Sequence, residues 1–421
     1  MFPWIISFIT IVIFFLSKSD FTLITKDSLL FLSQLVSLVG TVLLSFTFLL
    51  SSRLNFLEKF FGPLDKIYKK HHLYGSISFL LLISHPLLLA LKAFQNSASA
   101  NIYLLPSNNL VYSAGVLALY SLIIFLILTL LVKLPYHLWF KTHQLMGVVL
   151  FFALIHINFI NSDISRFPIL KLWIIFWVFI AFISYLYKRF FYNSFGPKFT
   201  YQVDKIENTN GVLDIYLSPT QNSIKYRPGQ FVFISFHQNG ISKEVHPFTI
   251  ASSPSSSQLR FCAKIVSDYT GSLSDLQKGS KTTIFGPNGQ LYQPFDSKKN
   301  LVLIAGGIGV TPFISMIEEE IFHPQKRQIN LFYTIRNSVS AFNNSQFKSF
   351  EVKNNNFKYH PIFTDIKPRL DAITIQKETP NFFSSLFILC GSQEMMLDLK
   401  NQLISLKINP KNIYYEDFSI K

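Results

Sequence analysis

The repeated phrases His71-His-Leu-Tyr-Gly75 and His143-Gln-Leu-Met-Gly147 decide how this sequence folds. Each phrase is followed by an apolar run and then by a second histidine, His85 in the first case and His156 in the second. Ionisable residues are costly inside a membrane helix, so a histidine at such a position is a functional-site candidate by default. The two stretches therefore predict two membrane helices, each with a histidine near either end.

Two such helices could hold two stacked hemes, each iron bound by one histidine from each helix, because neutral imidazole is a normal axial ligand. The repeat aligns His71 with His143, which predicts the pairs His71–His143 and His85–His156, with His72 as the alternative to His71. The glycine four residues after each leading histidine lies on the same helix face, where it would make room for a flat macrocycle. The plainer interpretation is that these histidines bond neighbouring helices or line a water-filled cavity.

The composition separates the chain into two halves. It has 421 residues and is 49% hydrophobic, but only the first half is uniformly apolar. The net charge of +15 would suit nucleic acid, yet lysine-rich cytoplasmic loops and sites for anionic cofactors explain it better, so no nucleic-acid partner is expected. The two cysteines, Cys262 and Cys390, offer neither a disulfide framework nor a metal cluster.

The first half contains six apolar segments, most of them near the ~20 residues needed to span a bilayer. They run over Phe2 to Leu16, Ser28 to Leu50, His71 to Leu91, Leu110 to Leu134, His143 to Ile160 and Ile169 to Tyr187. Lysine and arginine concentrate after the second, fourth and sixth segments, so the positive-inside rule predicts a multi-pass cell-membrane protein with both termini in the cytoplasm. His71 and His143 then lie toward the cytoplasm, about 20 Å from the level of the outer pair.

In the second half the sequence predicts short strands first, and then alternating strands and helices. Strands broken by turn residues, among them Asn208-Thr-Asn-Gly211, predict an antiparallel barrel over residues 193–298. The buried strand Asn300 to Ala305 is followed by Gly306-Gly-Ile-Gly-Val-Thr-Pro312 and a helix, an arrangement that binds phosphate groups. The alternation that continues to residue 421 predicts a doubly wound α/β domain.

Taken together, these motifs give a family resemblance over the whole chain. In order, the two histidine pairs, His246-Pro-Phe-Thr249, Gly306 to Pro312 and Cys390-Gly391 resemble the ferric reductase and NADPH oxidase superfamily, in a compact prokaryotic form. The resemblance implies a six-helix transmembrane heme domain at 1–192, an FAD-binding β-barrel at 193–298 and an NAD(P)H-binding α/β domain at 299–421. It implies two b-type hemes, FAD, and NADPH or NADH as the electron donor.

The resemblance also assigns individual residues. For FAD it implies His246, Pro247, Phe248, Thr249 and Ser252 along the flavin, and Asp268, Tyr269 and Thr270 at the pyrophosphate, where Ser267 replaces the family's usual glycine. For NAD(P)H it implies Gly306, Gly307, Gly309, Thr311, Pro312, Cys390 and Gly391, with Arg336 near the adenosine ribose. Phe418 resembles the near-terminal aromatic residue that covers the isoalloxazine ring, and with Cys390 it is the expected catalytic-site residue.

These assignments predict an electron path from cytosolic NAD(P)H through FAD and two hemes to an acceptor across the membrane. The expected acceptor is O2, giving superoxide, and reduction of ferric iron or another metal is the alternative within the class. A rival from another class is a nucleotide-regulated transporter or sensor whose membrane histidines carry protons or bind metal. No calcium-binding loop or long N-terminal regulatory region is visible, so we expect activity without an obligatory regulatory subunit.

Overall fold

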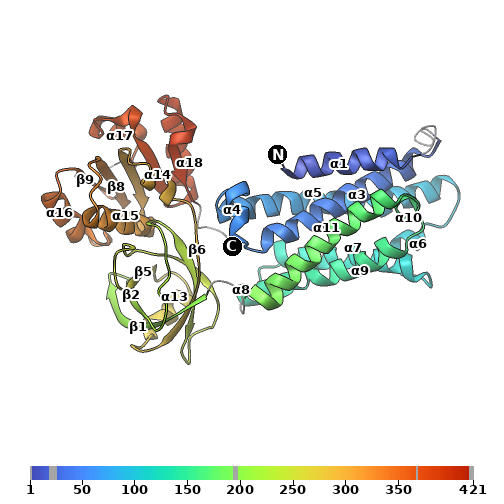
Figure 1. The fold of residues 1–421 in the computed structure, drawn as a ribbon, viewed down its shortest axis with the longest axis horizontal. Coiled ribbons are helices and arrows are strands. Elements are labelled where there is room, and N and C mark those ends of the chain that lie inside the picture. The colour runs from blue at the N-terminus through green and yellow to red at the C-terminus, as the bar shows by residue number, and fades with distance from the viewer. Residues whose placement is uncertain (1, 19–25, 193–197, 367, 417–421) are drawn as a thin grey trace. The chain divides into compact units, whose positions relative to one another are not determined.

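The computed structural model describes residues 2–18, 26–192, 198–366 and 368–416. The chain divides into a helical unit, residues 1–61 and 66–195, and a second unit, residues 62–65 and 196–421, that contains both sheets. Figure 1 shows helices alone in the first unit and two sheets with their covering helices in the second. Each unit is described by itself.

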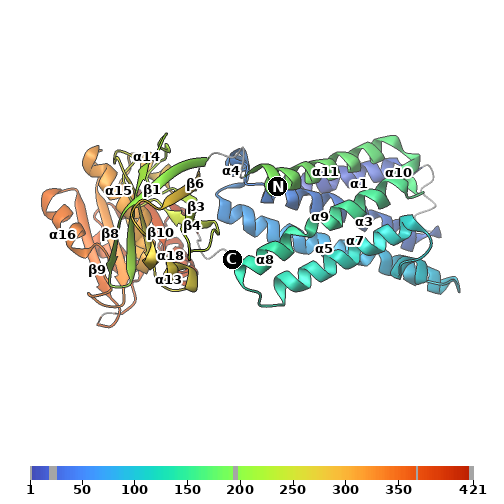
Figure 2. The ribbon, with the colours of Figure 1, turned by 90° about the horizontal axis from the view of Figure 1, so that it is seen from below.

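The helical unit is built from long apolar helices that run side by side in both views (Figures 1 and 2). The long elements are α1 (Phe2–Leu16), α3 (Ser28–Ser51), α5 (Leu64–Gln95), α7 (Leu110–Leu130), α8 (Tyr136–Gln144), α9 (Met146–Phe159) and α11 (Pro168–Leu186). The short ones are α4 (Asn55–Phe61), α6 (Asn101–Leu104), α10 (Asp163–Arg166) and the π-helical turn η1 (Tyr187–Phe191). Five stretches are long and apolar enough to cross a membrane, whereas α1, with 15 residues, is shorter.

The two histidine-bearing helices differ from the expected segments in instructive ways. The first begins at Leu64 rather than at His71, so His71 lies within α5. The second is interrupted at Leu145, between α8 and α9, which leaves His143 in the last turn of α8. The thirteen positions from His143 to His156 do not return to one face of a regular helix, so the sequence predicts either a tilt or a local irregularity.

Helix packing leaves space between the elements that carry the histidines. α3 packs against α1 and α11, and α7 packs against α9. Close approach of α3 and α5 depends on Gly40, where a Cβ atom would lie 3.0 Å from the Leu82 side chain. In the described part of the chain, α5 makes few close contacts with α9. Side chains of the two helices still share hydrophobic clusters, such as that of Tyr74 with Ile157.

The antiparallel sheet of the second unit forms a closed barrel. Its strands are β1 (Lys198–Thr209), β2 (Val212–Pro219), β3 (Phe231–His237), β4 (His246–Thr249), β5 (Leu259–Lys264) and β6 (Lys281–Asn288), in the order β4-β3-β6-β1-β2-β5. A bridge between Ile250 and Phe261 joins the two ends of that order. The predicted hairpin joins β1 to β2, with Asn210 and Gly211 both at positive φ, as a two-residue hairpin turn requires.

The second sheet is parallel and doubly wound. Its strands are β7 (Leu301–Gly306), β8 (Ile329–Ile335), β9 (Phe357–Phe363), β10 (Leu386–Cys390) and β11 (Ile413–Tyr415), in the order β11-β10-β7-β8-β9. The helices are α15 (Thr311–Phe322), α16 (Asn344–Lys353), α17 (Ala372–Glu378) and α18 (Gln393–Ser405). Strand order reverses between β7 and β10, where ligands bind in open α/β sheets. We call β7–β11 with these helices the nucleotide subdomain, and β1–β6 the barrel.

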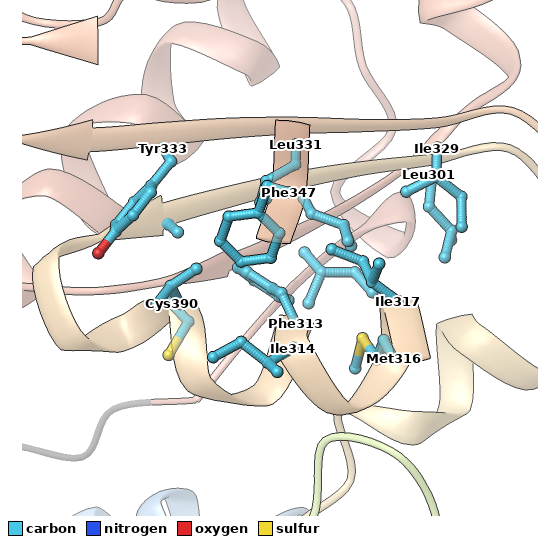
Figure 3. Close-up of a cluster of buried hydrophobic side chains, with 14 of the residues drawn as sticks. Leu301, Phe313, Ile314, Met316, Ile317, Ile329, Leu331, Tyr333, Phe347 and Cys390 are labelled. Atoms are coloured by element: carbon cyan, nitrogen blue, oxygen red, sulfur yellow. The ribbon is translucent and has the colours of Figure 1, made fainter. Parts of the chain in front are cut away.

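One hydrophobic cluster joins the barrel to the nucleotide subdomain. Residues of the barrel side, such as Ala251 and Cys262, belong to the same buried cluster as Phe313 and Ile317 of α15. Figure 3 shows the nucleotide side of this cluster, with α15 packed under β7 and β8 and beside Phe347 of α16. Burial of a continuous apolar cluster stabilises both parts together. The two sheets therefore share a core at their junction.

Candidate functional site

The inner pair of predicted ligands, His71 of α5 and His143 of α8, face each other in the helical unit. Their ring centroids lie 6.1 Å apart with the ring planes at 74°. The Nδ1 of His71 is 2.9 Å from the carbonyl oxygen of Thr47, and since a carbonyl only accepts, this nitrogen carries the proton. Nε2 is then the nitrogen with a free lone pair. His143 stacks on Trp139, with centroids 5.7 Å apart and planes at 1°.

The outer pair, His85 of α5 and His156 of α9, is anchored in the same way. The Nδ1 of His85 lies 3.0 Å from the carbonyl oxygen of Ser33, and the Nδ1 of His156 lies 2.8 Å from that of Val111. Metal-binding histidines commonly donate their second ring N–H to such an acceptor, which fixes the tautomer and the ring orientation. Both outer imidazoles are therefore held with Nε2 available.

A cavity of about 540 Å³ lies at the level of the outer pair. Both His85 and His156 line it, and so do residues of α1, α3, α7, α10 and α11. Its walls are mainly apolar, while α3 contributes the polar stripe Gln34, Ser37, Thr41 and Ser45. Ligand pockets usually fall between about 300 and 1,000 Å³. The cavity therefore has the size and lining of a site for a large, mostly apolar ligand.

The glycines near the histidines do not all act as the sequence predicted. A Cβ at Gly75 would meet nothing within 4 Å, as expected for a glycine that leaves room for a ligand. A Cβ at Gly147 would collide with the ring of Tyr185, so this glycine accommodates a side chain of α11 instead. The expectation for Gly147 was wrong because it considered one helix face without its neighbour. Gly115 of α7 was missed: its Cβ would lie 2.9 Å from Nδ1 of His156.

The choice between His71 and His72 has a structural basis. His72 is exposed, whereas His71 is partly buried and bonded to the backbone of α3. The imidazole of His71 also lies against that of His143. This geometry supports His71 as the ligand, and the assignment stays a prediction.

The predicted flavin segment is strand β4, at one end of the barrel strand order. The His246 ring lies against the Tyr269 ring with centroids 3.7 Å apart, and its Nε2 is 2.9 Å from a carboxylate oxygen of Glu244. Burial lowers the pKa of His246, and Glu244 partly opposes this effect. The Tyr269 hydroxyl is buried and has no hydrogen-bond partner among the described residues. A bound cofactor could satisfy that hydroxyl.

The segment predicted to bind pyrophosphate lies beside β4 through Tyr269, in α13 (Asp268–Ser272). The hydroxyl of Thr270 is already engaged locally, since it accepts from the backbone N–H groups of Val266 and Ser267 at 3.0 Å. The structure therefore gives Thr270 a capping role. Because the Tyr269 ring lies on that of His246, the turn stays next to the flavin segment and remains a candidate cofactor contact.

Ser252 lies in the loop after β4, at the junction of the barrel and the nucleotide subdomain. It is buried, its backbone carbonyl accepts from the hydroxyl of Ser315 on α15 at 2.6 Å, and its own hydroxyl accepts from the backbone N–H of Arg260 at 3.1 Å. Tyr226 also donates to its carbonyl. The assignment of Ser252 to the flavin stays a prediction.

The glycine turn lies at the reversal point of the parallel sheet. β7 ends at Gly306, residues Gly307–Val310 form a 3₁₀ turn, and α15 begins at Thr311 with Pro312 in its first turn. A Cβ at Gly309 would collide with the carbonyl oxygen of Cys390. The absence of a side chain at Gly309 therefore lets the turn after β7 pack against the end of β10. Gly307, at φ +54° with open space around it, is the glycine that faces a possible ligand.

Cys390 ends β10 and Gly391 follows it, and a Cβ at Gly391 would lie 3.1 Å from the Gly306 Cα. Burial, and to a lesser degree Glu416, raises the pKa of the Cys390 thiol, so it stays protonated at neutral pH. Arg336 is exposed one residue beyond the end of β8, on the same edge of the sheet. Phe418, the remaining predicted residue, lies outside the described residues.

Sequence reasoning missed Glu416, which lies two residues before Phe418. Its side chain is buried and accepts from the backbone N–H of Gln290, in the turn that follows β6. Its carboxylate is also close enough to raise the Cys390 pKa. The sequence shows an acidic residue two positions before Phe418, and this could have marked Glu416 as a candidate. Nothing near it in the sequence indicates that its side chain would bond to the barrel at Gln290.

Comparison with known proteins agrees with this organisation. Residues 36–154 match the family described as ferric reductase like transmembrane component, residues 198–311 match an FAD-binding domain, and residues 303–401 match an oxidoreductase NAD-binding domain. This is the architecture of the ferric reductase and NADPH oxidase superfamily. The chain thus combines a helical region with apolar helices long enough to span a membrane, an FAD-binding domain and an oxidoreductase NAD-binding domain, the order of domains that the sequence predicted.

Curated relatives resemble part of this chain. Flavohemoprotein A of Dictyostelium discoideum is 22% identical over 232 residues, which cover 51% of this chain and 58% of that protein. The anthranilate 1,2-dioxygenase electron transfer component of Acinetobacter baylyi is 22% identical over 233 residues, which cover 51% of this chain and 65% of that protein. The chain thus spans roughly three-fifths of the length of these relatives.

A solved structure gives a likeness of fold. The flavohemoglobin from Malassezia yamatoensis aligns with a TM-score of 0.53 at 18% identity, covering 94% of this chain and 98% of that one. At this identity the likeness concerns the fold alone.

The glycine turn can be tested by adding one methyl group. In Gly309→Ala the new Cβ would collide with the Cys390 carbonyl, and overpacking of about 1–3 kcal/mol should displace the turn. We expect NADP+ affinity, measured by calorimetry, to fall about tenfold or more while FAD content stays normal. Gly240→Ala, which lies outside the turn and meets no neighbour but carries the strain of a positive-φ position, is the control and should leave NADP+ affinity unchanged. Unchanged NADP+ affinity in Gly309→Ala would show that the turn is not part of the nucleotide site.

Proposed function

We propose that this protein oxidises NAD(P)H on the cytoplasmic side of a membrane and delivers the electrons singly to O2 across it. The balanced reaction is NAD(P)H + 2 O2 → NAD(P)+ + H+ + 2 O2•−. Within it, FAD supplies the conversion from two-electron to one-electron chemistry, and two hemes supply one-electron carriers. The proposal extends the oxidoreductase class that the domain architecture establishes.

The observation that carries the proposal is the arrangement of the four membrane histidines. Three of them place Nδ1 against a backbone carbonyl, which leaves Nε2 as the ligating nitrogen. The inner rings face each other at 6.1 Å between centroids, so His71 and His143 would hold one ion between them. The residues present therefore fit two hemes, one held by His71 and His143 and the other by His85 and His156.

The hemes would be b-type, bound without covalent attachment. Covalent attachment requires a Cys-x-x-Cys-His motif, and the two cysteines, Cys262 and Cys390, are far apart in the sequence. The outer heme would occupy the 540 Å³ cavity that His85 and His156 line. The cavity has polar groups on α3 and charged residues at Lys18, Asp27, Asp163 and Arg166, but most of its wall is apolar. A mainly apolar wall suits a macrocycle better than a proton path.

The second unit supports FAD and NAD(P)H at adjoining positions. The unpartnered hydroxyl of Tyr269 and the ring of His246 fit a flavin cofactor beside β4. The turn at Gly307 and the N-terminus of α15 fit the pyrophosphate of a dinucleotide. Arg336, exposed at the same sheet edge, favours NADPH over NADH because it could pair with a 2′-phosphate.

The cavity lining bears on the acceptor. Close to His85 the wall is apolar, with Leu82 and Leu89 lining it. Three of the four charged residues of the lining are held in ion pairs: Lys18 pairs with Asp163, and Asp27 pairs with Lys92, while Arg166 is the fourth. A small uncharged molecule can reach the region near His85 without separating these pairs, whereas a bulky ferric chelate would have to stay outside them. This lining supports O2 as the acceptor, with ferric chelates as the alternative to be measured.

The ligand assignment predicts which variants lose a heme. His85→Ala and His156→Ala should each lose one heme of two and keep flavin reduction by NAD(P)H, because the outer iron loses an axial ligand. His72→Ala is the matched control, since His72 is exposed, and it should keep both hemes. Heme content is measured from the pyridine hemochrome spectrum of purified protein. Two hemes per chain in both outer variants, or a loss in His72→Ala, would refute the pairing.

The acceptor assignment predicts the product. Protein in liposomes that is given NADPH on one side should reduce cytochrome c on the other side, and superoxide dismutase should abolish that signal. Ferric citrate under anaerobic conditions is the competing acceptor. If ferric citrate is reduced rapidly and aerobic NADPH oxidation yields no dismutase-sensitive signal, the protein is a metal reductase.

A further inference from the structure

Helix α15 connects the two cofactor segments of the second unit. It begins at Thr311, directly after the glycine turn. Along its length it contacts two loops of the barrel. The Ser315 hydroxyl donates to the Ser252 carbonyl at 2.6 Å, the Glu318 carboxylate accepts from the Ser253 N–H at 3.1 Å, and the Met316 methyl group lies against Gly229. Ser252 comes three residues after the end of β4. Helix α15 therefore follows the glycine turn directly and contacts the loop that follows the predicted flavin segment.

A buried network of charged and polar groups crosses the same junction. On the barrel, Arg260 of β5 donates to Asp214 of β2 through Nε at 2.7 Å and Nη2 at 2.6 Å. From the nucleotide subdomain, Asn343 accepts from Arg260 Nη2 at 2.9 Å, and Glu318 Oε1 lies 3.6 Å from Arg260 Nη1. The Arg260 and Asp214 side chains are 9% and 8% exposed. Gln346 also donates to Glu318 at 3.4 Å.

This network adds direction to a junction that is otherwise apolar. The shared hydrophobic cluster holds the barrel and the nucleotide subdomain together, but hydrophobic contact is non-directional and tolerates sliding. The Arg260 guanidinium, by contrast, is buried and bonded on both sides of the junction. Sliding would break these bonds and leave an unpaired buried charge, which is strongly destabilising. Burial raises the pKa of Glu318, and Arg260 opposes that shift.

We propose that Glu318 is a positioning residue for the reduction of the flavin by NAD(P)H. With Arg260, and beside Glu319, which accepts from the hydroxyls of Ser253 and Ser255, it holds α15 against the loop at Ser253. The contact thereby fixes the glycine turn relative to β4. The inference rests on the proposed function, since it requires the flavin beside β4 and the nicotinamide nucleotide at the glycine turn. It assigns no contact between Glu318 and either cofactor. Its effect is on geometry, and a displacement of about 1 Å can cost about a hundredfold in rate.

The same helix provides a matched control. Glu320, two residues further along α15, is also buried and bonds to Arg327 at 3.0 and 2.6 Å. Its other bond is to the backbone N–H of Gln325 at 2.8 Å. Both partners belong to the nucleotide subdomain. Glu318→Gln and Glu320→Gln therefore remove the same charge from the same helix, but only the first weakens a bond across the junction.

The test compares these two variants in the full-length, FAD-loaded protein. One readout is the rate at which saturating NADPH bleaches the flavin absorbance without oxygen. The other is hydrogen–deuterium exchange of residues 252–257, measured also in Glu318→Ala, which removes the acceptor for the Ser253 N–H. We expect Glu318→Gln to slow bleaching about tenfold or more, with NADPH affinity and FAD content nearly unchanged. Exchange at 252–257 should rise in both Glu318 variants. Glu320→Gln should melt at a lower temperature but bleach at the normal rate.

Each outcome decides something. Normal bleaching in Glu318→Gln, or equal slowing in Glu318→Gln and Glu320→Gln, would overturn the positioning role. Unchanged exchange at residues 252–257 in Glu318→Ala would do the same, even if the protein lost activity. If NADPH failed to bleach the flavin of the unmodified protein, the proposed function would fall, and the exchange experiment would still decide whether Glu318 holds the loop.

Discussion

The hydrogen bond between a histidine Nδ1–H and a backbone carbonyl is the interaction on which the helical unit depends. In an apolar bundle each imidazole must satisfy its N–H, since an unpaired buried donor costs about 1–3 kcal/mol. His71, His85 and His156 do so with the carbonyls of Thr47, Ser33 and Val111 on neighbouring helices. Each bond fixes a ring orientation and leaves Nε2 free. The outer pair, held in this way, borders a cavity.

In the second unit the corresponding constraint is that two cofactor sites must keep a fixed relation to each other. The parallel sheet reverses its order between β7 and β10, and this brings the glycine turn next to Cys390. The barrel closes through the Ile250–Phe261 bridge, just after the segment predicted to hold the flavin. A shared core holds these parts together, and the bonds of Ser315 and Glu318 set their register.

Local patterns in the sequence were enough to predict the architecture. A buried strand followed by a glycine turn and a helix predicted the nucleotide site, and Asn208 to Gly211 predicted the hairpin at the place where it occurs. Such signals depend on near neighbours in the chain. The spacing of His143 and His156 predicted either a tilt or a helix irregularity, and the structure has an irregularity at Leu145.

Features that depend on distant parts of the chain were not predictable in this way. Gly147 was assigned to a macrocycle because nothing local places Tyr185 against it, and Gly115 was overlooked because its contact, His156, is on another helix. The bonds of Ser252 to Arg260 and Ser315 were not predicted either, because tertiary packing brings these partners to it. In each case the deciding partner is brought close by the fold, and such an approach has no periodic signature in the sequence.

The central claim, that the four membrane histidines form two axial-ligand pairs, is tested most directly by the cofactor content and spin state of the purified protein. After heme-replete expression, the pyridine hemochrome and flavin spectra should give two b-type hemes for each FAD. Both hemes should be low-spin, because both axial positions are filled by imidazole. A ratio of one heme or none to each FAD, or a high-spin signal from either heme as isolated, would contradict it.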